Sequence, residues 1–441
     1  MKRKGTVVQV TGPVVDVAFD GGSLPEINEA LSVAPDGQPR MMEVAQHVGG
    51  DTVRCIMLSP SEGIGRGDEV LVPTLTFIAA VNPVRYAGAE PIFIGCGDSL
   101  CSAIASRPVF ENIATDSSTG MMPGIPTRAM RCIEFSRFYD GYHRFWPTDE
   151  KDAICPLVCG VSVSGRVQRV VEALLHANNI GGISVAITGN PEGALAKAAK
   201  YSVLVDVPPC QTAPCVTSYQ TTMFALMVFG LHVSVATGKL TRVQAQAQID
   251  AMLDFAAQYT DELIDRVEQQ MTPLAEQWSA EKLEYMEFIG DDADYATAFF
   301  GSAKMVEAFG AQVCVDDSEG WAHVSVFRRE PRRIPTFFVA NSTCASISRL
   351  KESIQTSVAM QRPTVVMTDL PKEEFPEEAV AVTLPKPKLA WMNPLMEYLP
   401  MACIAACMQV LENETPYRGA SAVHNLDAAA DRFAKSKLVV L

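Results

Sequence analysis

The sequence predicts an α/β fold made of two doubly wound parallel-sheet lobes preceded by a small N-terminal β-barrel. Three observations predict it. The first residues alternate apolar and polar side chains, as short antiparallel strands do. From residue 91 onward, apolar strand candidates alternate with helical patterns, which is typical of a parallel sheet covered by helices. These candidates form two series, and the last three members of each are separated by a nearly constant offset of roughly 180 residues, which indicates a repeated domain.

The composition is that of a folded, acidic protein. The chain has 441 residues, 48% hydrophobic and 20% charged, which is enough for two or three domains. Its formal net charge of −15 disfavours nucleic acid or an anionic membrane surface as the main partner. The 12 cysteines are scattered, with no CxxC pair and no clustering with the 6 histidines. We therefore predict reduced thiols, no metal site and a cytoplasmic location.

The apolar segments do not indicate a membrane protein. Gln9, Pro13 and Asp16 interrupt the apolar run near the N-terminus, so we predict no signal peptide. Two later stretches, Met223–Val235 and Leu395–Leu411, are shorter than the about 20 apolar residues that a membrane span needs. We read both as core helices and expect no membrane partner.

Residues 1–66 predict the barrel. Val15, Val17 and Phe19 alternate with other side chains after a Gly12-Pro13 turn, and Thr52–Leu58 is a further strand candidate. The strings GTVVQVTGPVVDVAF, SLPEINEAL and EVAQHVGGDTVRCIMLSPSEGIGRG resemble the N-terminal barrel of the catalytic β subunit of the rotary ATP synthase.

The nucleotide site of that family is not expected in this chain. ATP hydrolysis needs a GxxxxGK[ST] loop, whose amides and lysine hold the phosphates, and the sequence contains none. The closest string, Val233–Leu240, lacks the first glycine and the final hydroxyl. Gly63–Gly67 is glycine-rich, but no strand-to-helix pattern surrounds it.

Residues 67–90 form a second short fragment. GDEVLVPTLTFIAAVNPVRYAGAEP resembles one strand–helix–strand piece of the pyridoxal-phosphate aminotransferases that act on nucleotide sugars. The catalytic lysine and the cofactor-phosphate site of that family lie downstream of such a piece, and nothing after Pro91 continues the resemblance. We therefore expect a structural βα unit and no cofactor.

The rest of the chain predicts two lobes, 91–240 and 281–441, joined by a helical connector at 241–280. Within the connector, apolar residues recur at helical spacing from Thr241 to about Ser279. The strand candidates of the two lobes are Pro91–Ile94, Met130–Ile133, Cys155–Cys159, Ile183–Thr188 and Val203–Val207, and then Tyr285–Ile289, Gln312–Val315, Pro335–Ala340, Thr364–Met367 and Ala379–Leu384.

Glycines and serines follow the strands of the first lobe. They occur in GCGDS after the first strand, in CGVSVSG after the third and in TGNP after the fourth. Glycines let a backbone approach an anion, and hydroxyls with helix N-terminal amides hold it. This ordered set resembles the sugar isomerase (SIS) domain family, and 91–441 resembles its tandem form. That form occurs in the isomerase half of glucosamine-6-phosphate synthase and in fructosamine-6-phosphate deglycases.

The resemblance implies a phosphosugar site in the first lobe. Carried over by motif, Ser99, Ser162 and Ser164 bind the substrate phosphate, and Val163 contributes its backbone amide. The family often has a threonine two residues after the SxSG glycine, where this chain has Val167. The alternative is that these serines only cap helices.

The resemblance places candidate catalytic residues in the second lobe. Lys304 and Glu307 are three residues apart on one helical face, as in the ALKLKE helix of the synthase, where the lysine and final glutamate are catalytic. A carboxylate there can move a proton between C1 and C2 of an open-chain sugar. From spacing alone, a solvated Lys–Glu pair is the alternative.

Two further residues complete the implied site. His323, in DDSEGWAH, resembles the family histidine that opens the sugar ring from the neighbouring subunit. Lys435 in the ending AKS resembles the lysine of the NLAKS tail, although the extra stretch Gly419–Asp431 disturbs that alignment. A glutamate of the synthase falls here at Phe300.

We expect a homodimeric, metal-free and cofactor-free phosphosugar isomerase or fructosamine-phosphate deglycase. Glutamine amidotransfer is not expected, because the chain begins Met1-Lys2 rather than with a cysteine nucleophile. One alternative is a catalytically silent phosphosugar-binding or regulatory SIS protein. A third is an ATP-synthase-like assembly module.

Overall fold

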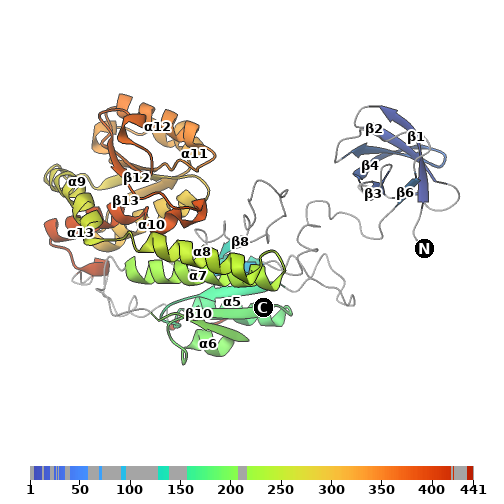
Figure 1. Cartoon of the computed structure of the whole chain (residues 1–441), viewed down its shortest axis with the longest axis horizontal. Coiled ribbons are helices and arrows are strands. Elements are labelled where there is room, and N and C mark those ends of the chain that lie inside the picture. The colour runs from blue at the N-terminus through green and yellow to red at the C-terminus, as the bar shows by residue number, and fades with distance from the viewer. Residues whose placement is uncertain are drawn as a thin grey trace. The chain divides into compact units, whose positions relative to one another are not determined.

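The computed structural model divides into two compact units, Met1–Ala87 and Gly88–Leu441, and each has its own apolar core (Figure 1). The structure describes residues 4–11, 14–19, 24–25, 27, 29–34, 40–57, 69–71, 91–95, 128–138, 156–206, 216–418, 421 and 435–440.

The first unit contains a closed six-stranded barrel, as the alternation predicted. Its strands are β1 (Lys4–Thr11), β2 (Val14–Ala18), β3 (Ala30–Val33), β4 (Arg40–Gly49), β5 (Thr52–Met57) and β6 (Glu69–Leu71), in the order β1-β2-β5-β4-β3-β6. Val7, Val15 and Val17 point inward with Val53 and Cys55, and none of the five is exposed. The period of two in the side chains thus gives the barrel a core of its own.

The barrel extends beyond residue 66, where the predicted boundary lay. Strand β6 pairs antiparallel with both β1 and β3, and these pairings close the barrel. The expected separate βα unit at 67–90 therefore begins with a barrel strand instead. Its remaining residues, 72–90, and the glycine string Gly63–Gly67 lie outside the described residues.

The second unit contains two five-stranded parallel sheets with the same strand order. The first sheet has β7 (Pro91–Gly95), β8 (Arg128–Arg131), β9 (Leu157–Val161), β10 (Ile183–Thr188) and β11 (Tyr201–Leu204), in the order β11-β10-β9-β7-β8. The second has β12 (Tyr285–Ile289), β13 (Gln312–Asp316), β14 (Thr336–Val339), β15 (Thr364–Thr368) and β16 (Val380–Thr383), in the order β13-β12-β14-β15-β16. Numbered within each lobe, both orders read 2-1-3-4-5, which is a doubly wound topology.

Most predicted strands agree closely with these bounds. The third, fourth and fifth strands of the two lobes start at 157 and 336, 183 and 364, and 201 and 380, so the offsets are 179, 181 and 179. The second strand of the first lobe differs. It ends at Arg131, because Cys132 and Ile133 already belong to the helix that follows.

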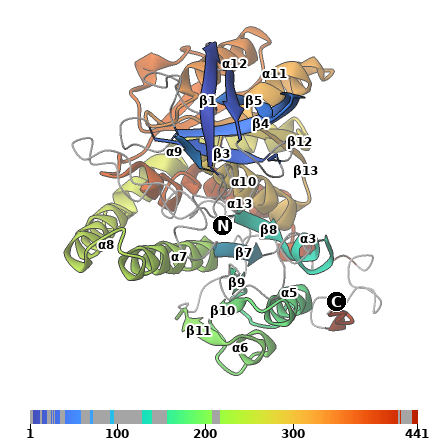
Figure 2. The same ribbon diagram turned by 90° about the vertical axis from the view of Figure 1, so that its right-hand side faces the viewer.

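Helices cover both faces of each sheet (Figures 1 and 2). In the first lobe, α3 (Cys132–Phe138), α5 (Gln168–Asn179) and α6 (Ala194–Ala198) lie on one face and α7 (Val216–Ala236) on the other. In the second lobe, α11 (Ser318–His323) and α12 (Ile347–Ala359) lie on one face, and α10 (Ala293–Phe309) and α13 (Leu399–Leu411) on the other. Single-turn 3-10 helices are η1 (Ser325–Phe327), η2 (Pro331–Arg333), η3 (Lys372–Glu374) and η5 (Pro416–Arg418), and η4 (Ala390–Leu395) is longer.

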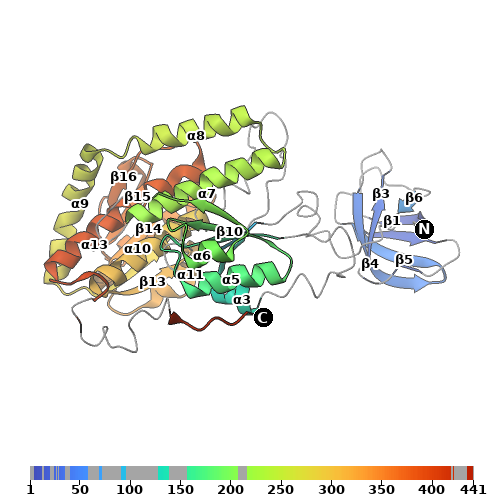
Figure 3. The same ribbon diagram turned by 90° about the horizontal axis from the view of Figure 1, so that it is seen from below.

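The connector forms two long helices, as predicted: α8 (Arg242–Ala256) and α9 (Asp261–Ala280). A capping box between Thr241 and Gln244 starts α8. The Thr260 side chain caps α9, and acidic residues in its first turn favour the helix dipole. Figure 3 shows α8 running beside α7 and α9 leading into the second lobe.

One apolar core joins the two lobes. It contains Cys159 and Ile187 from the first sheet, Phe288 and Val365 from the second, and the inner faces of the connecting helices. Between the lobes, the ring of Tyr219 on α7 stacks on that of Phe300 on α10, with 3.8 Å between centroids. The two lobes are thus held together by buried apolar surface.

Two apolar segments, Val216–Ala236 and Ala390–Leu411, have the length and composition that a membrane span requires. Of an apolar 18-residue window in Ala390–Leu411, 72% is buried inside the protein, compared with 44% of the corresponding window in Val216–Ala236. Helix α13 packs against α9 and α10, as the core helix of a globular protein does. The expectation that no membrane is involved stays a prediction.

The barrel should be dispensable for folding of the second unit, because its apolar residues are buried in its own core. We expect a fragment comprising residues 88–441 to give the far-UV circular dichroism of an α/β protein and a cooperative thermal transition. Failure of this fragment to fold, with the full chain folding normally, would contradict the prediction.

Candidate functional site

The serine loop of the first lobe, Ser162–Gly165, lies where a doubly wound sheet binds its ligands. In such sheets the ligand site lies at the carboxyl ends of the two strands where the strand order reverses. Here these strands are β7 and β9, which pair in parallel from Pro91↔Leu157 to Ile94↔Gly160. The chain therefore leaves both strands at the same edge of the sheet. Ser99, which follows β7, lies outside the described residues.

Backbone hydrogen bonds fix the shape of the serine loop. Ser162 is buried, and its amide donates to the Ile187 carbonyl at 3.0 Å. The Val163 carbonyl accepts from the Gly189 amide at 2.9 Å, and Asn190 Nδ2 donates to the Ser164 carbonyl at 3.2 Å. The loop after β10 thus holds the serine loop in place.

Gly165 allows the chain to turn from this loop into α5. Its φ is +64°, and a Cβ there would lie 3.0 Å from Thr188 Oγ1, so any other residue is strained. Val167 is the N-cap of α5 and supplies no side-chain cap. With valine rather than threonine at this position, the first turn of α5 has no side-chain hydroxyl from its N-cap. The N-terminus of α5, which is the positive end of the helix dipole, follows shortly after the serine loop, and Ser164 is exposed there.

The equivalent edge of the second lobe is acidic. Asp291, after β12, accepts hydrogen bonds from the Ser318 amide and hydroxyl, each at 2.7 Å, and from the Ser346 hydroxyl. Asp369 likewise accepts from the amide and hydroxyl of Ser342, each at 2.6 Å. Carboxylates already occupy the donors that a phosphate needs, and their charge repels it. This edge of the second lobe is therefore poorly suited to a phosphate.

Lys304 and Glu307 lie on the face of α10 that turns toward the first lobe. Phe300, Lys304 and Glu307 share one helical face at spacings of four and three, and Phe300 contacts Tyr219 of α7. Lys304 Nζ lies 2.5 Å from Glu307 Oε2 and 5.0 Å from the centre of the Phe300 ring. The Lys304 side chain is fully buried and that of Glu307 is 27% exposed. The alternative of a solvated pair is thus wrong for the lysine.

His323 lies on the other face of the second sheet, at the end of α11. Its side chain is 69% exposed, and its Nε2 lies 2.6 Å from Glu319 Oε1. Glu319 also accepts from Arg349 Nε at 2.8 Å. The hydrogen bonds from His323 and then Arg349 lower the pKa of Glu319, so this carboxylate stays ionised beside the imidazole. Because α10 and α11 cover opposite faces, the sheet separates His323 from Glu307 within one chain.

The C-terminal segment that carries Lys435 lies against α5. Figures 2 and 3 show it beside this helix. Arg169 in the first turn of α5 donates to the Lys437 carbonyl, and the Val439 amide donates to Glu172 Oε2 at 2.6 Å. Lys435 itself is exposed, and the inserted residues 422–431 lie outside the described part of the chain. The structure thus brings the predicted tail to the helix that follows the serine loop.

Sequence reasoning missed Glu172, which anchors this tail. Its side chain is fully buried and accepts from Arg169 at 2.6 Å, from Arg137 at 2.8 Å and from Ser136 at 3.0 Å. Burial alone raises the pKa of Glu172, but the bonds from the Val439 amide, Arg137 and Ser136 outweigh it and lower the pKa. The available signal was an acidic residue inside the apolar run VVEALL.

A second missed group is the buried carboxyl pair Asp294 and Glu397. Asn341 Nδ2 donates to Asp294 Oδ2 at 3.3 Å and to Glu397 Oε1, and Thr297 Oγ1 donates to Glu397 Oε2 at 2.9 Å. Burial raises the pKa of Asp294 to about 7 and raises the pKa of Glu397 well above its usual range. The two carboxyls therefore hold a proton near neutral pH. Their hydrogen bonds connect α10 with Asn341 after β14 and with Glu397 just before α13.

Two family models match the N-terminal part of the chain. The ATP synthase alpha/beta family β-barrel domain matches residues 7–72, in agreement with the barrel. The DegT/DnrJ/EryC1/StrS aminotransferase family matches residues 45–114, which straddle the two units. Both resemblances read from the fragments are confirmed.

Solved structures match the two-lobed unit. The C-terminal domain of glucosamine-fructose-6-phosphate aminotransferase from Francisella tularensis is similar with a TM-score of 0.62 and 14% identity, over 76% of this chain and 89% of that one. A candidate phosphosugar isomerase from Clostridium difficile 630 is similar with a TM-score of 0.58 and 15% identity, over 77% of this chain and 90% of that one. Glucosamine-6-phosphate deaminase from Thermotoga maritima is similar with a TM-score of 0.51 and 16% identity, over 73% of this chain and 85% of that one. At this identity the likeness shows the fold, and it confirms the predicted two-lobed architecture.

The raised pKa of Asp294 predicts that stability depends on pH. The folded state keeps a proton that an unfolded aspartate, with a pKa of 3.8, has lost, so stability falls as the pH rises from about 4 to about 7. The free energy of unfolding, measured by urea denaturation, should therefore decrease between pH 5 and pH 8 by an amount on the order of a few kcal/mol. Asp294→Asn should flatten this dependence.

Asp265→Asn, which changes an exposed aspartate on α9, is the matched control and should leave the pH dependence as in the unmodified protein. Parallel pH profiles for the Asp294→Asn variant and the unmodified protein would refute the assignment.

Proposed function

We propose that the Gly88–Leu441 unit is a phosphosugar isomerase or fructosamine-phosphate deglycase. The observation that carries this proposal is the preformed serine loop at the carboxyl end of β9, which opens into the N-terminus of α5. Ser162, Ser164 and the Val163 amide hold the phosphate, together with Ser99 from the adjacent loop. The fold that this unit shares with the solved phosphosugar enzymes supports the assignment.

The proton transfer is assigned to Glu307. Once the sugar phosphate is bound in its open-chain form, the carboxylate removes the proton from one of the carbons C1 and C2 and returns it to the other, through an enediol or enolamine. Lys304 Nζ lies 2.5 Å from Glu307 Oε2, and this contact holds the carboxylate in place. In a deglycase the same shift leaves an imine at C1. Water adds to this imine, and the C–N bond then breaks to release the amine and the aldose phosphate.

The remaining residues are assigned by position. The tail brings Lys435 toward the sugar from α5, where Glu172 and Arg169 anchor it. His323 is exposed on the opposite face of the second sheet, so it is available to a sugar bound by a second subunit. We propose a homodimer in which His323 of the partner subunit opens the sugar ring.

A silent phosphosugar-binding protein is the second candidate. Phe300 stands where the synthase has a glutamate, and its ring is buried against Tyr219 rather than exposed to a ligand. Binding without turnover would support this candidate. An assembly module supplied by the barrel has only the resemblance of residues 7–72 in its favour.

Glu307→Gln should lower kcat by about 10²–10⁴-fold, because the amide cannot accept the proton. Affinity for the sugar phosphate should change little, since the serine loop lies in the other lobe. The measurement is a screen of sugar phosphates and fructosamine phosphates for turnover, with calorimetry for affinity. Glu276→Gln, an exposed change on α9, is the control that should keep full activity. Normal turnover by Glu307→Gln would rule out the assigned base.

His323→Ala should slow turnover of cyclic substrates more than that of open-chain ones, because ring opening precedes the proton shift. If the imidazole acts across a dimer, mixing His323→Ala with Glu307→Gln subunits should restore part of the activity, since some hybrid sites carry both groups. Activity of the mixture equal to the average of the two separate variants would exclude action across the dimer.

A further inference from the structure

A basic cavity lies at the amino ends of the strands of the second sheet, at the edge opposite Asp291. Its volume is about 640 Å³, and its walls include Tyr285 and Gln312, the first residues of β12 and β13. Its charged lining residues are four cations and two acids: Lys282, Arg328, Arg329, Arg333, Glu284 and Glu330. This is a local excess of positive charge on a chain whose net charge is −15.

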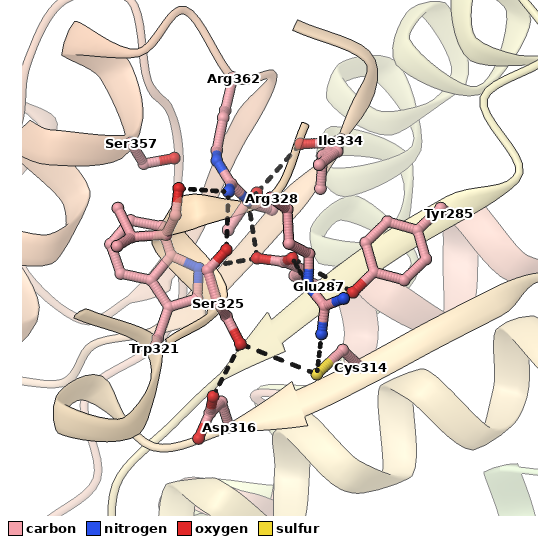
Figure 4. A network of polar contacts seen from close by, with 12 residues as sticks. Tyr285, Glu287, Cys314, Asp316, Trp321, Ser325, Arg328, Ile334, Ser357 and Arg362 are labelled. Atoms are coloured by element: carbon pink, nitrogen blue, oxygen red, sulfur yellow. Dashed lines mark hydrogen bonds and ion pairs between the residues drawn. The ribbon is translucent and has the colours of Figure 1, made fainter. Parts of the chain in front are cut away.

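A buried polar network fixes one wall of this cavity (Figure 4). Glu287 is almost fully buried and accepts from Arg362 at 2.6 Å, from Arg328 at 2.9 Å and from Trp321 Nε1 at 2.7 Å. One carboxylate thus faces two guanidinium groups, so a positive charge remains in the wall. Arg328 also lies 5.1 Å from the centre of the Tyr285 ring, and its side chain is 41% exposed. Its orientation is therefore set from the protein side, and its outer edge faces the cavity.

The next arginine is free to bind a ligand. Within the described residues, the exposed guanidinium of Arg329 has no hydrogen bond or ion pair. Arg333 is different, because its Nη2 donates to the carbonyls of Glu281 and Lys282 and supports the cavity rim. Arg328 is thus held in position by Glu287, and the adjacent Arg329 is unpaired among the described residues.

An exposed aromatic ring lines the same cavity. Phe327, immediately before Arg328, is 80% exposed. An apolar ring beside two cations suits a ligand with an anionic group at one end and a flat or apolar part at the other. A cavity of this size matches a small molecule rather than a macromolecule, and the net charge of the chain disfavours nucleic acid.

We propose that this cavity binds a small phosphorylated organic anion. Its phosphate contacts Arg328 and Arg329, and its ring or hydrocarbon part lies on Phe327. The site lies at the amino ends of the strands of the second sheet, whereas the edge equivalent to that of the serine loop, with Asp291, lies at their carboxyl ends. It uses none of the residues assigned to turnover. The proposal therefore stands independently of the proposed function.

The test is calorimetric titration of the full chain with phenyl phosphate and with inorganic phosphate. Phenyl phosphate should bind more tightly than inorganic phosphate. Arg329→Ser should raise the Kd of both by at least about tenfold, the typical effect of losing a charged hydrogen bond. Phe327→Ser should remove the preference for phenyl phosphate while inorganic phosphate binds as before. Lys372→Ser, which removes an exposed cation from η3, is the control that should change neither Kd.

Three results would overturn the proposal. One is no binding of either probe to the unmodified protein, and another is equal Kd values for the unmodified protein and Arg329→Ser. The third is loss of all binding in Ser164→Ala with Arg329→Ser unaffected, which would place the anion in the first lobe. Sedimentation of the Arg329→Ser and Phe327→Ser variants completes the test. A change of oligomeric state would be a fourth overturning result, because it would assign the surface to contact with a second copy.

Discussion

The buried contact between α7 and α10 is the constraint on which the arrangement of the two lobes depends. Tyr219 stacks on Phe300 in a core to which both sheets contribute. The serine loop lies on one lobe and the Lys304–Glu307 pair on the other, so this contact sets the distance between them. Because protein cores are close-packed, a change of volume at Phe300 moves the pair as well as lowering stability. Gly301, beside Phe300, has no room for a Cβ against Met401, so α13 packs closely against α10.

Two sheets of identical topology carry opposite chemistry at the same edge. After β9 the chain presents serines, glycines and the start of a long helix, whereas after β12 and β15 it presents Asp291 and Asp369. Each of these aspartates accepts from a serine amide and hydroxyl, the kind of donors that we propose for a phosphate in the first lobe. The second lobe thus satisfies its loops internally and keeps their shape without a ligand. The strand order determines where a site can lie, and the side chains determine whether an anion enters it.

Much of the fold follows from local patterns. The strands Ile183–Thr188 and Tyr285–Ile289 have the bounds predicted for them, because a buried parallel strand is a short apolar run between polar turns. Strand β6 could not be predicted, since its three residues carry no periodicity and pair with strands far away in the sequence. The burial of Lys304 could not be predicted either. A Lys–Glu spacing of three reads the same on an exposed helix, and only the packing of α10 distinguishes the two. Asp294 and Glu397 meet only after folding, so neither shows its raised pKa in the sequence.

Helix α11 connects the two ends of the second lobe. Trp321 on this helix donates to the buried Glu287, and Ser325 just beyond it donates to Asp316 Oδ2 at 2.9 Å. Arg328 follows within the same short segment and bonds Glu287 from the side of the basic cavity. His323 lies between these anchors, with its exposed imidazole held by Glu319. Arg328 and Trp321 both bond the buried Glu287 carboxylate, and no solvent there can replace either partner. A rearrangement of the Arg328–Glu287 pair therefore also disturbs the segment that positions His323.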